Sequence, residues 1–68
     1  MTIAQHTRLK RIEAGMSQQK IGDALGLNKI QVHRRETGKT KWRWDEIVEV
    51  AKLFGQSLTE FVAEFENQ

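Results

Sequence analysis

The sequence predicts an all-α domain of five short helices, and three observations indicate this fold class. Proline is absent, and 4 of the 5 glycines divide the chain into segments of helical length. Within these segments apolar residues recur at spacings of three and four, the repeat of a helix with one buried face. The alternation of apolar and polar residues that is typical of strands is missing. A chain of 68 residues has room for one domain, so we expect residues 1–68 to fold as a unit.

The first two helices are predicted over residues 3–14 and 18–25. The first ends where Gly15 can adopt the left-handed conformation of a helix terminus, and Ser17 is a suitable N-cap for the second. Gly22 lies inside the second helix at a cost of about 1 kcal/mol relative to alanine, so we expect another helix to cross close to it. In the first helix the apolar residues Ile3, Leu9 and Ile12 sit among polar ones. In the second helix Ile21, Ala24 and Leu25 fall on one face, which is predicted to meet the core.

A third helix is predicted over residues 29–37, with Asn28 as its N-cap and Gly38 as its stop. Val32 should face the core, four residues beyond the cap. The connection to the second helix, residues 26–28, has the length of a helix-turn-helix turn. The second and third helices are therefore expected to form a helix-turn-helix.

Residues 39–44 lack apolar periodicity and are predicted to form a loop, from which Trp44 turns inward to the core. Asp45 is the expected N-cap of a fourth helix that Gly55 ends. The run SLTE at 57–60 has the spacing of a capping box for a fifth helix. The apolar residues predicted to face the core are Ile47, Val50, Ala51 and Phe54 in the fourth helix, and the fifth carries Leu58, Phe61, Val62 and Phe65.

Charge is distributed unevenly along the chain. Residues 1–44 hold 10 of the 11 Lys and Arg residues and 3 acidic residues, whereas residues 45–68 hold 1 lysine and 6 acidic residues. This asymmetry favours a polyanionic partner for the first two thirds of the chain, with the last third in water or against another partner. Ordinary solvated charge is the alternative interpretation.

Several functional classes are not expected from this sequence. There is no cysteine, which excludes disulfides, thiolate zinc sites and a cysteine nucleophile. His6 and His33 have no carboxylate or cysteine partner at a catalytic or metal-binding spacing, and no glycine-rich phosphate loop is present. No apolar run approaches the ~20 residues of a membrane span. We therefore expect no enzyme, catalytic residue, metal, cofactor, small-molecule ligand or membrane association, and a cytoplasmic location.

An ordered set of residues extends from the first helix to the fifth: Met16-Ser17-Gln18, Leu25-Gly26-Leu27-Asn28, Val32, Arg34, Glu36, Gly38-Lys39 and Leu58. With this set, residues 8–63 resemble the lambdoid phage repressor and Cro family of helix-turn-helix proteins. Arg11 and the run ETGKTK at 36–41 are similar to the small phage repressors. The resemblance implies a five-helix lambda-repressor-like domain that binds double-stranded DNA as a sequence-specific transcriptional regulator, of the phage or prophage repressor kind.

The resemblance places the base-contacting positions of the family on Lys29, Ile30 and Arg34, with Gln31 and His33 at the margin. A major groove about 12 Å wide admits one such helix. Lys29 and Arg34 can donate to guanine O6 and N7, and Ile30 can pack on thymine methyl groups. A solvated surface role is the alternative for the polar residues, and chance exposure or core packing is the alternative for Ile30.

Five further residues are expected at DNA phosphates: Gln18, Asn28, Lys39, Lys41 and Arg43. Gln18 lies in the first turn of the second helix, where free backbone N–H groups attract the same anion. The matching family position has this role, and a simple surface glutamine is the alternative. The three cations in the loop could clamp the DNA backbone, or they could be solvated while the tryptophans fill the core.

Arg11 and Glu36 occupy positions that form an ion pair between the first and third helices of the resembling repressors. Such a pair would orient the third helix more than it would stabilise the domain, because desolvation offsets most of the Coulomb gain. Arg35 departs from the family pattern, which usually has a large apolar residue there. Its stem could lie along the core, or its guanidinium could stack on Trp42 or Trp44.

The fifth helix has more apolar surface than docking on a small core requires. We expect Leu58, Phe61 and Phe65 at a two-fold dimer interface, as in the family, where dimers read palindromic half-sites about 34 Å apart. A longer last helix folding back on the first is the alternative. Two other functions remain open: an antitoxin-type helix-turn-helix protein whose main partner is a toxin, and a nonspecific DNA-binding protein.

Overall fold

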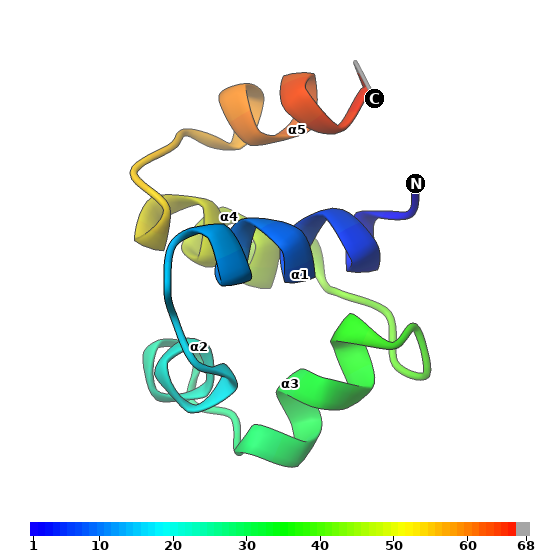
Figure 1. Cartoon of the computed structure of the whole chain (residues 1–68), viewed down its shortest axis with the longest axis vertical. Helices are drawn as coiled ribbons and strands as arrows, with labels where there is room; N and C mark the ends of the chain where they lie inside the picture. The colour runs from blue at the N-terminus through cyan, green and yellow to red at the C-terminus, as the bar shows by residue number, and fades with distance from the viewer. Residues whose placement is uncertain (67–68) are drawn as a thin grey trace.

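Five α-helices joined by short turns form the computed structural model, which describes residues 1–66 (Figure 1). The helices are α1 (Ile3–Glu13), α2 (Gln18–Leu25), α3 (Lys29–Glu36), α4 (Trp44–Leu53) and α5 (Leu58–Glu66). Figure 1 shows α2 and α3 at one end of the molecule, α5 at the other, and α1 and α4 between them. No helix among these residues is both long and apolar enough to cross a membrane. The predicted all-α fold with five helices is confirmed.

Helix ends follow local signals in the sequence. The four glycines predicted as stops, at positions 15, 26, 38 and 55, all have positive φ angles, between 69° and 84°. At Gly26 this left-handed residue turns the chain from α2 toward α3, and its backbone N–H donates to the Gly22 carbonyl oxygen. A side chain at φ 72° would be strained there, so the tight helix-helix connection depends on glycine.

Three helix N-termini are capped as predicted. The Ser17 hydroxyl accepts a hydrogen bond from the backbone N–H three residues on, at 3.0 Å. The Asn28 side chain accepts a hydrogen bond from the Gln31 backbone N–H, and the Gln31 side chain accepts one from the Asn28 backbone N–H, both at 2.8 Å. Ser57 and Glu60 form the predicted capping box, at 3.2 and 3.0 Å. Hydrogen bonds from the backbone N–H and the hydroxyl of Ser57 lower the pKa of the Glu60 carboxyl group.

The predicted N-cap of α4 was wrong by two residues. The helix begins at Trp44, and Arg43 is its N-cap residue. The Glu46 carboxylate accepts the Arg43 backbone N–H at 3.0 Å. Asp45 lies in the first turn instead, where it pairs with the Arg43 side chain at 3.1 Å.

The core lies where α2, α3, α4 and α5 meet, and it also takes in the loop before α4 and the start of α1. Val32 is fully buried, as predicted. The eight buried apolar residues are Ala4, Ile21, Val32, Trp42, Ile47, Val50, Ala51 and Phe61. Phe61 packs tilted against the ring of His6, with 4.7 Å between the ring centroids, and stacks with Phe54 at 6.1 Å.

The inner face of α1 carries two polar residues. Ala4, His6 and Thr7 are buried, whereas Leu9 and Ile12 are 39% and 49% exposed. The Thr7 hydroxyl donates to a carbonyl oxygen of its own helix, and the His6 ring packs against aromatic rings of α5. The Thr7 hydroxyl thus has a hydrogen-bond partner within the helix. Ile3 packs against the core beside these residues.

The two tryptophans exchange their predicted places. Trp42 is 9% exposed and belongs to the core, whereas Trp44 is 66% exposed. The guanidinium of Arg35 lies 6.0 Å from the ring centre of Trp42, and its Nε donates to Glu46 at 3.0 Å. Arg35 therefore covers Trp42 and joins α3 to α4, which accounts for its place at a position expected to be apolar.

Gly22 is required by a close backbone contact of the turn after α2. Another helix also approaches it, as predicted, because a side-chain carbon of Val32 in α3 lies 3.5 Å from the place of a Cβ atom. A Cβ atom at this position would lie 2.5 Å from the carbonyl oxygen of Leu27, in the turn after α2. The Leu27 backbone N–H donates to the Gly22 carbonyl oxygen at 2.8 Å. The turn therefore folds back on α2 and occupies the space beside Gly22. Ala24 of the same helix was predicted to face the core, but it is exposed.

Candidate nucleic-acid interface

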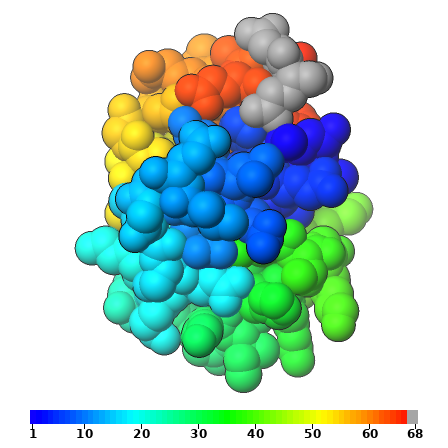
Figure 2. All heavy atoms as spheres, in the orientation of Figure 1, coloured from blue at the N-terminus to red at the C-terminus, as the bar shows by residue number. Residues whose placement is uncertain are grey.

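The outer face of α3 consists of the predicted base-contacting residues. All five are exposed: Lys29, Ile30, Gln31, His33 and Arg34. Ile30 is 62% exposed and is the large apolar side chain of this face, whereas Val32 of the same helix is buried. Figure 2 shows the side chains of α3 protruding from the end of the molecule opposite α5. Such a ridge can enter a groove without rearrangement of the fold.

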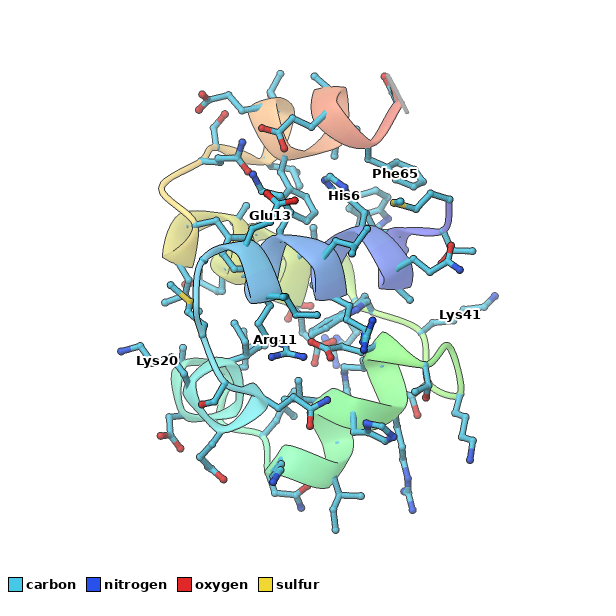
Figure 3. All side chains as sticks on the ribbon, viewed as in Figure 1. His6, Arg11, Glu13, Lys20, Lys41 and Phe65 are labelled. Atoms are coloured by element: carbon cyan, nitrogen blue, oxygen red, sulfur yellow. The ribbon has the colours of Figure 1, made fainter. Side chains whose placement is uncertain are left out.

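A buried ion pair fixes α3 against α1. Arg11 Nε donates to Glu36 Oε2 at 2.6 Å, and Arg11 Nη2 donates to Glu36 Oε1 at 3.1 Å. A third donor of Arg11, Nη1, bonds the carbonyl oxygen of Met16 at 2.8 Å. The Glu36 side chain is almost completely buried. Figure 3 shows Arg11 extending from α1 toward α2 and α3, so one guanidinium holds the turn before α2 and the end of α3 together.

Gln18 belongs to the same cluster. Its Nε2 donates to Glu36 Oε1 at 3.0 Å and lies 3.2 Å from His33 Nδ1. The side-chain nitrogen expected to bind phosphate is thus directed at two protein groups. The backbone N–H of Lys20 donates to Ser17. The N–H groups of Gln18 and Gln19 would serve an anion, because a helix N-terminus leaves them without intrahelical partners.

The capping box of α3 determines how Asn28 and Gln31 present their amides. In each residue the side-chain oxygen accepts a backbone N–H, as described above. The amide nitrogens therefore point away from the backbone, and both residues are exposed. Two hydrogen-bond donors at the N-terminus of α3 suit phosphate oxygens or the acceptor atoms of a base edge.

The loop after α3 is tied to the end of the helix. The carbonyl oxygen of Arg34 accepts the backbone N–H groups of Lys39 and Thr40, at 2.9 and 3.2 Å. Lys39 and Lys41 are exposed, and Figure 3 shows Lys41 extending away from the body of the molecule. Arg43 is exposed too, in a surface pair with Asp45 that is too open to restrain it strongly.

Positive and negative charge separate in space as they do along the sequence. The exposed cations of α2, α3 and the following loop are Lys20, Lys29, Arg34, Lys39, Lys41 and Arg43. The acidic residues of α5, at the opposite end of Figure 1, are Glu60, Glu64 and Glu66. Glu64 pairs with Lys10 at 3.0 Å, and hydrogen bonds from Lys10 and Gln56 lower the pKa of its carboxyl group. The end that carries α3 is thus the one that would attract a polyanion.

The residues expected at a dimer interface occupy different environments. Phe61 is completely buried within the monomer, so the structure corrects its assignment: it is a core residue and offers no surface to a second chain. Leu58 is half-buried. Phe65 is half-buried beside His6, with 5.8 Å between the ring centroids (Figure 3).

Two features of this surface were not foreseen from the sequence. The bond between Gln18 and His33 joins residues 15 positions apart, and the Arg35–Glu46 pair joins residues 11 positions apart. Opposite charge at positions 35 and 46 is the only signal that could have suggested the second. Within residues 1–66, no group of three or more His, Cys, Asp or Glu side chains is arranged to hold a metal ion.

Comparison with known proteins agrees with this geometry. A family model described as Helix-turn-helix matches residues 8–61, from α1 into α5. No match was found among curated proteins or among solved structures. The matched region includes α2, the turn at Gly26 and α3, which are the parts that form the candidate interface. The chain therefore belongs to the XRE/Cro/C1-type helix-turn-helix family of DNA-binding regulators.

Proposed function

We propose that this protein is a sequence-specific transcriptional regulator of the Cro and phage repressor kind, which binds palindromic operator half-sites as a dimer. One observation carries the proposal: α3 exposes all five candidate reading residues while Val32 and Glu36 bury its inner face. A helix held in this way presents a fixed set of side chains to the major groove.

The base contacts would come from three residues with different chemistry. Lys29 and Arg34 carry donors that fit guanine O6 and N7, and Arg can form two bonds at once. Ile30 supplies an exposed apolar surface that fits the methyl group of thymine. Gln31 and His33 lie on the same exposed face and would contact bases or the adjoining backbone.

Phosphate contacts would flank the reading helix on both sides. Asn28 and the N-terminus of α2 provide neutral donors on one side, and Lys39, Lys41 and Arg43 provide cations on the other. Each cation that neutralises a phosphate releases counterions, so affinity should fall steeply as salt rises.

Dimerisation would use the apolar surface of α5 and the start of α4. A hollow of about 380 Å³ is lined by Trp44, Leu58, Thr59, Val62, Ala63 and Glu66. Trp44 is an exposed aromatic residue of the kind that anchors protein interfaces. We infer that Trp44, with Leu58 and Phe65, takes the part first assigned to Phe61.

The test is selection of bound duplexes from a random pool, repeated at two salt concentrations. A palindromic consensus supports the proposal, whereas a steep salt dependence without enrichment supports nonspecific binding. Arg34→Ala should weaken binding to the selected site by about tenfold, because a good base contact is worth about 1–3 kcal/mol. The matched control is Lys52→Ala, which removes the same charge from an exposed position on α4.

A second function is favoured by the exposed apolar residues of α1. Leu9 and Ile12 are 39% and 49% exposed and belong to α1, outside the candidate reading helix. An antitoxin-type protein would use such a surface to bind a toxin. Tight one-to-one binding of a co-encoded protein, lost in Leu9→Ser and kept in Arg34→Ala, would support this function, as would the absence of any DNA binding.

A further inference from the structure

The buried carboxylate of Glu36 determines the orientation of the Gln18 amide. Glu36 Oε1 accepts from Arg11 Nη2 at 3.1 Å and lies 3.0 Å from Gln18 Nε2. A carboxylate paired with a guanidinium can only accept hydrogen bonds. The amide of Gln18 must therefore turn its nitrogen, and not its oxygen, toward Glu36.

The same nitrogen carries a second hydrogen, which is directed at His33. Gln18 Nε2 and His33 Nδ1 are 3.2 Å apart. In a neutral imidazole one ring nitrogen donates and the other accepts. Because Nδ1 faces a donor, it must accept, and the ring proton must reside on Nε2. The carboxylate of Glu36 thus sets the tautomer of His33 through the amide of Gln18.

His33 presents this proton at the outer face of α3. The residue is exposed and lies between the core residue Val32 and the candidate reading residue Arg34. Since Nδ1 turns toward Gln18, Nε2 lies on the other side of the ring. Its N–H is free of the bond that fixes the ring, and it can meet an acceptor outside the protein.

We propose that Gln18 is a positioning residue that fixes His33 as a hydrogen-bond donor through Nε2, and that this donor binds an acceptor atom of the DNA duplex. The inference rests on the proposed DNA-binding function. Phosphate oxygens, purine N7, guanine O6 and thymine O4 share the required chemistry. The proposal also gives the Gln18 amide two protein partners in α3, His33 and Glu36, in place of the DNA phosphate expected from the sequence.

The tautomer can be measured without DNA. Long-range ¹H–¹⁵N correlation spectra of the His33 ring, recorded at about pH 8 where an ordinary imidazole is neutral, should show the proton on Nε2. Gln18→Ala should give a mixture of both tautomers. The matched control is Gln19→Ala, because the Gln19 amide bonds Asp23 on the outside of α2. A proton on Nδ1 in the unmodified protein, or no change in Gln18→Ala, would overturn the inference.

The DNA contact is tested with the selected operator. His33→Ala should lower affinity roughly three- to tenfold, the effect of one lost hydrogen bond, and His33→Gln should restore most of it, because its amide offers a donor at similar reach. Removing one acceptor at a time identifies the partner: 7-deaza purines remove N7, 2-aminopurine in place of guanine removes O6, 5-methyl-2-pyrimidinone in place of thymine removes O4, and neutral methylphosphonate linkages test a phosphate. One of these replacements should abolish the difference between wild type and His33→Ala. Equal affinity of His33→Ala and wild type would contradict the proposed contact.

The two proposals fail in different ways. A His33 ring with its proton on Nδ1 would overturn the inference while leaving DNA binding intact. A wild-type chain that binds no duplex would overturn the proposed function and the contact to DNA, whatever the tautomer of His33.

Discussion

α3 and α5 lie at opposite ends of the molecule, and they are attached to it by different forces. α3 buries only Val32 and Glu36 and is held by directional bonds from Arg11 and Gln18, with Arg35 joining it to α4. α5 is held by Phe61, its buried aromatic core residue, and by half-buried apolar residues such as Leu58 and Phe54 that pack against the core.

The difference follows from what each outer face has to do. Hydrogen bonds and ion pairs depend on angle as well as distance, whereas apolar contacts are non-directional. A helix whose outer face is to be read against base edges gains from a fixed rotation about its axis. A helix that closes a core needs only to keep its apolar side covered.

Phe61→Ala should have the largest effect on stability. Truncating a completely buried Phe typically costs about 3–5 kcal/mol, through lost burial and the cavity left behind. Urea unfolding followed by circular dichroism measures this loss. When DNA affinity is measured without urea and under conditions that keep the variant folded, it should match that of wild type. A specific loss of affinity would show that α5 also controls the position of α3.

Glu36→Ala should lower stability by about 3 kcal/mol, because it leaves the Arg11 guanidinium buried without a charge partner. DNA affinity of the folded fraction should fall as well, since α3 loses its tie to α1. The double variant Arg11→Met with Glu36→Leu separates the effects: it should recover stability by apolar packing and still bind DNA weakly. Normal stability and normal affinity in Glu36→Ala would contradict an orienting role for the pair.

Ile30→Ala should leave stability unchanged, because the side chain is exposed in the free protein. It should reduce discrimination at one thymine of the operator by about 1–2 kcal/mol, in line with the burial of a few methylene groups. Ile12→Ala is the matched control, a half-exposed isoleucine on α1. Competition binding against duplexes with uracil in place of thymine measures the effect, and equal loss on both duplexes would exclude a methyl contact.

The smallest effect is expected from pH acting on α5. The pKa values of Glu60 and Glu64 are lowered from 4.5 by hydrogen bonds from Ser57 and from Lys10 and Gln56. Because the folded pKa lies below the unfolded one, the stability that these carboxylates add is present above pH 4.5 and is lost as pH falls through the folded values. Urea midpoints at pH 6 and pH 3 should differ less in Glu60→Gln than in wild type. An unchanged difference would show that other groups dominate.

Predictions about most helix ends and about the exposed side of α3 agree with the structure, because their signals are local. Gly26 and Asn28 act within a few residues of their own position, so their neighbours in sequence are their neighbours in space. The burial of Val32 was predicted from its place four residues after the Asn28 cap. The exposure of Ile30 was then expected, because Ile30 lies off the side of the helix that Val32 buries. The resemblance to repressors supplied the pairing of Arg11 with Glu36, which no local pattern contains.

The sequence by itself determined the five helices, the turn between α2 and α3, and the side of α3 that faces outward, because backbone conformation and helical period are local properties. Tertiary structure decided which tryptophan is buried. Trp42 and Trp44 are equally apolar, and the choice depends on Arg35 and Glu46, which meet only when α3 packs beside α4. It also decided that the Gln18 amide faces Glu36 and His33, since such a bond requires three residues from two helices to converge.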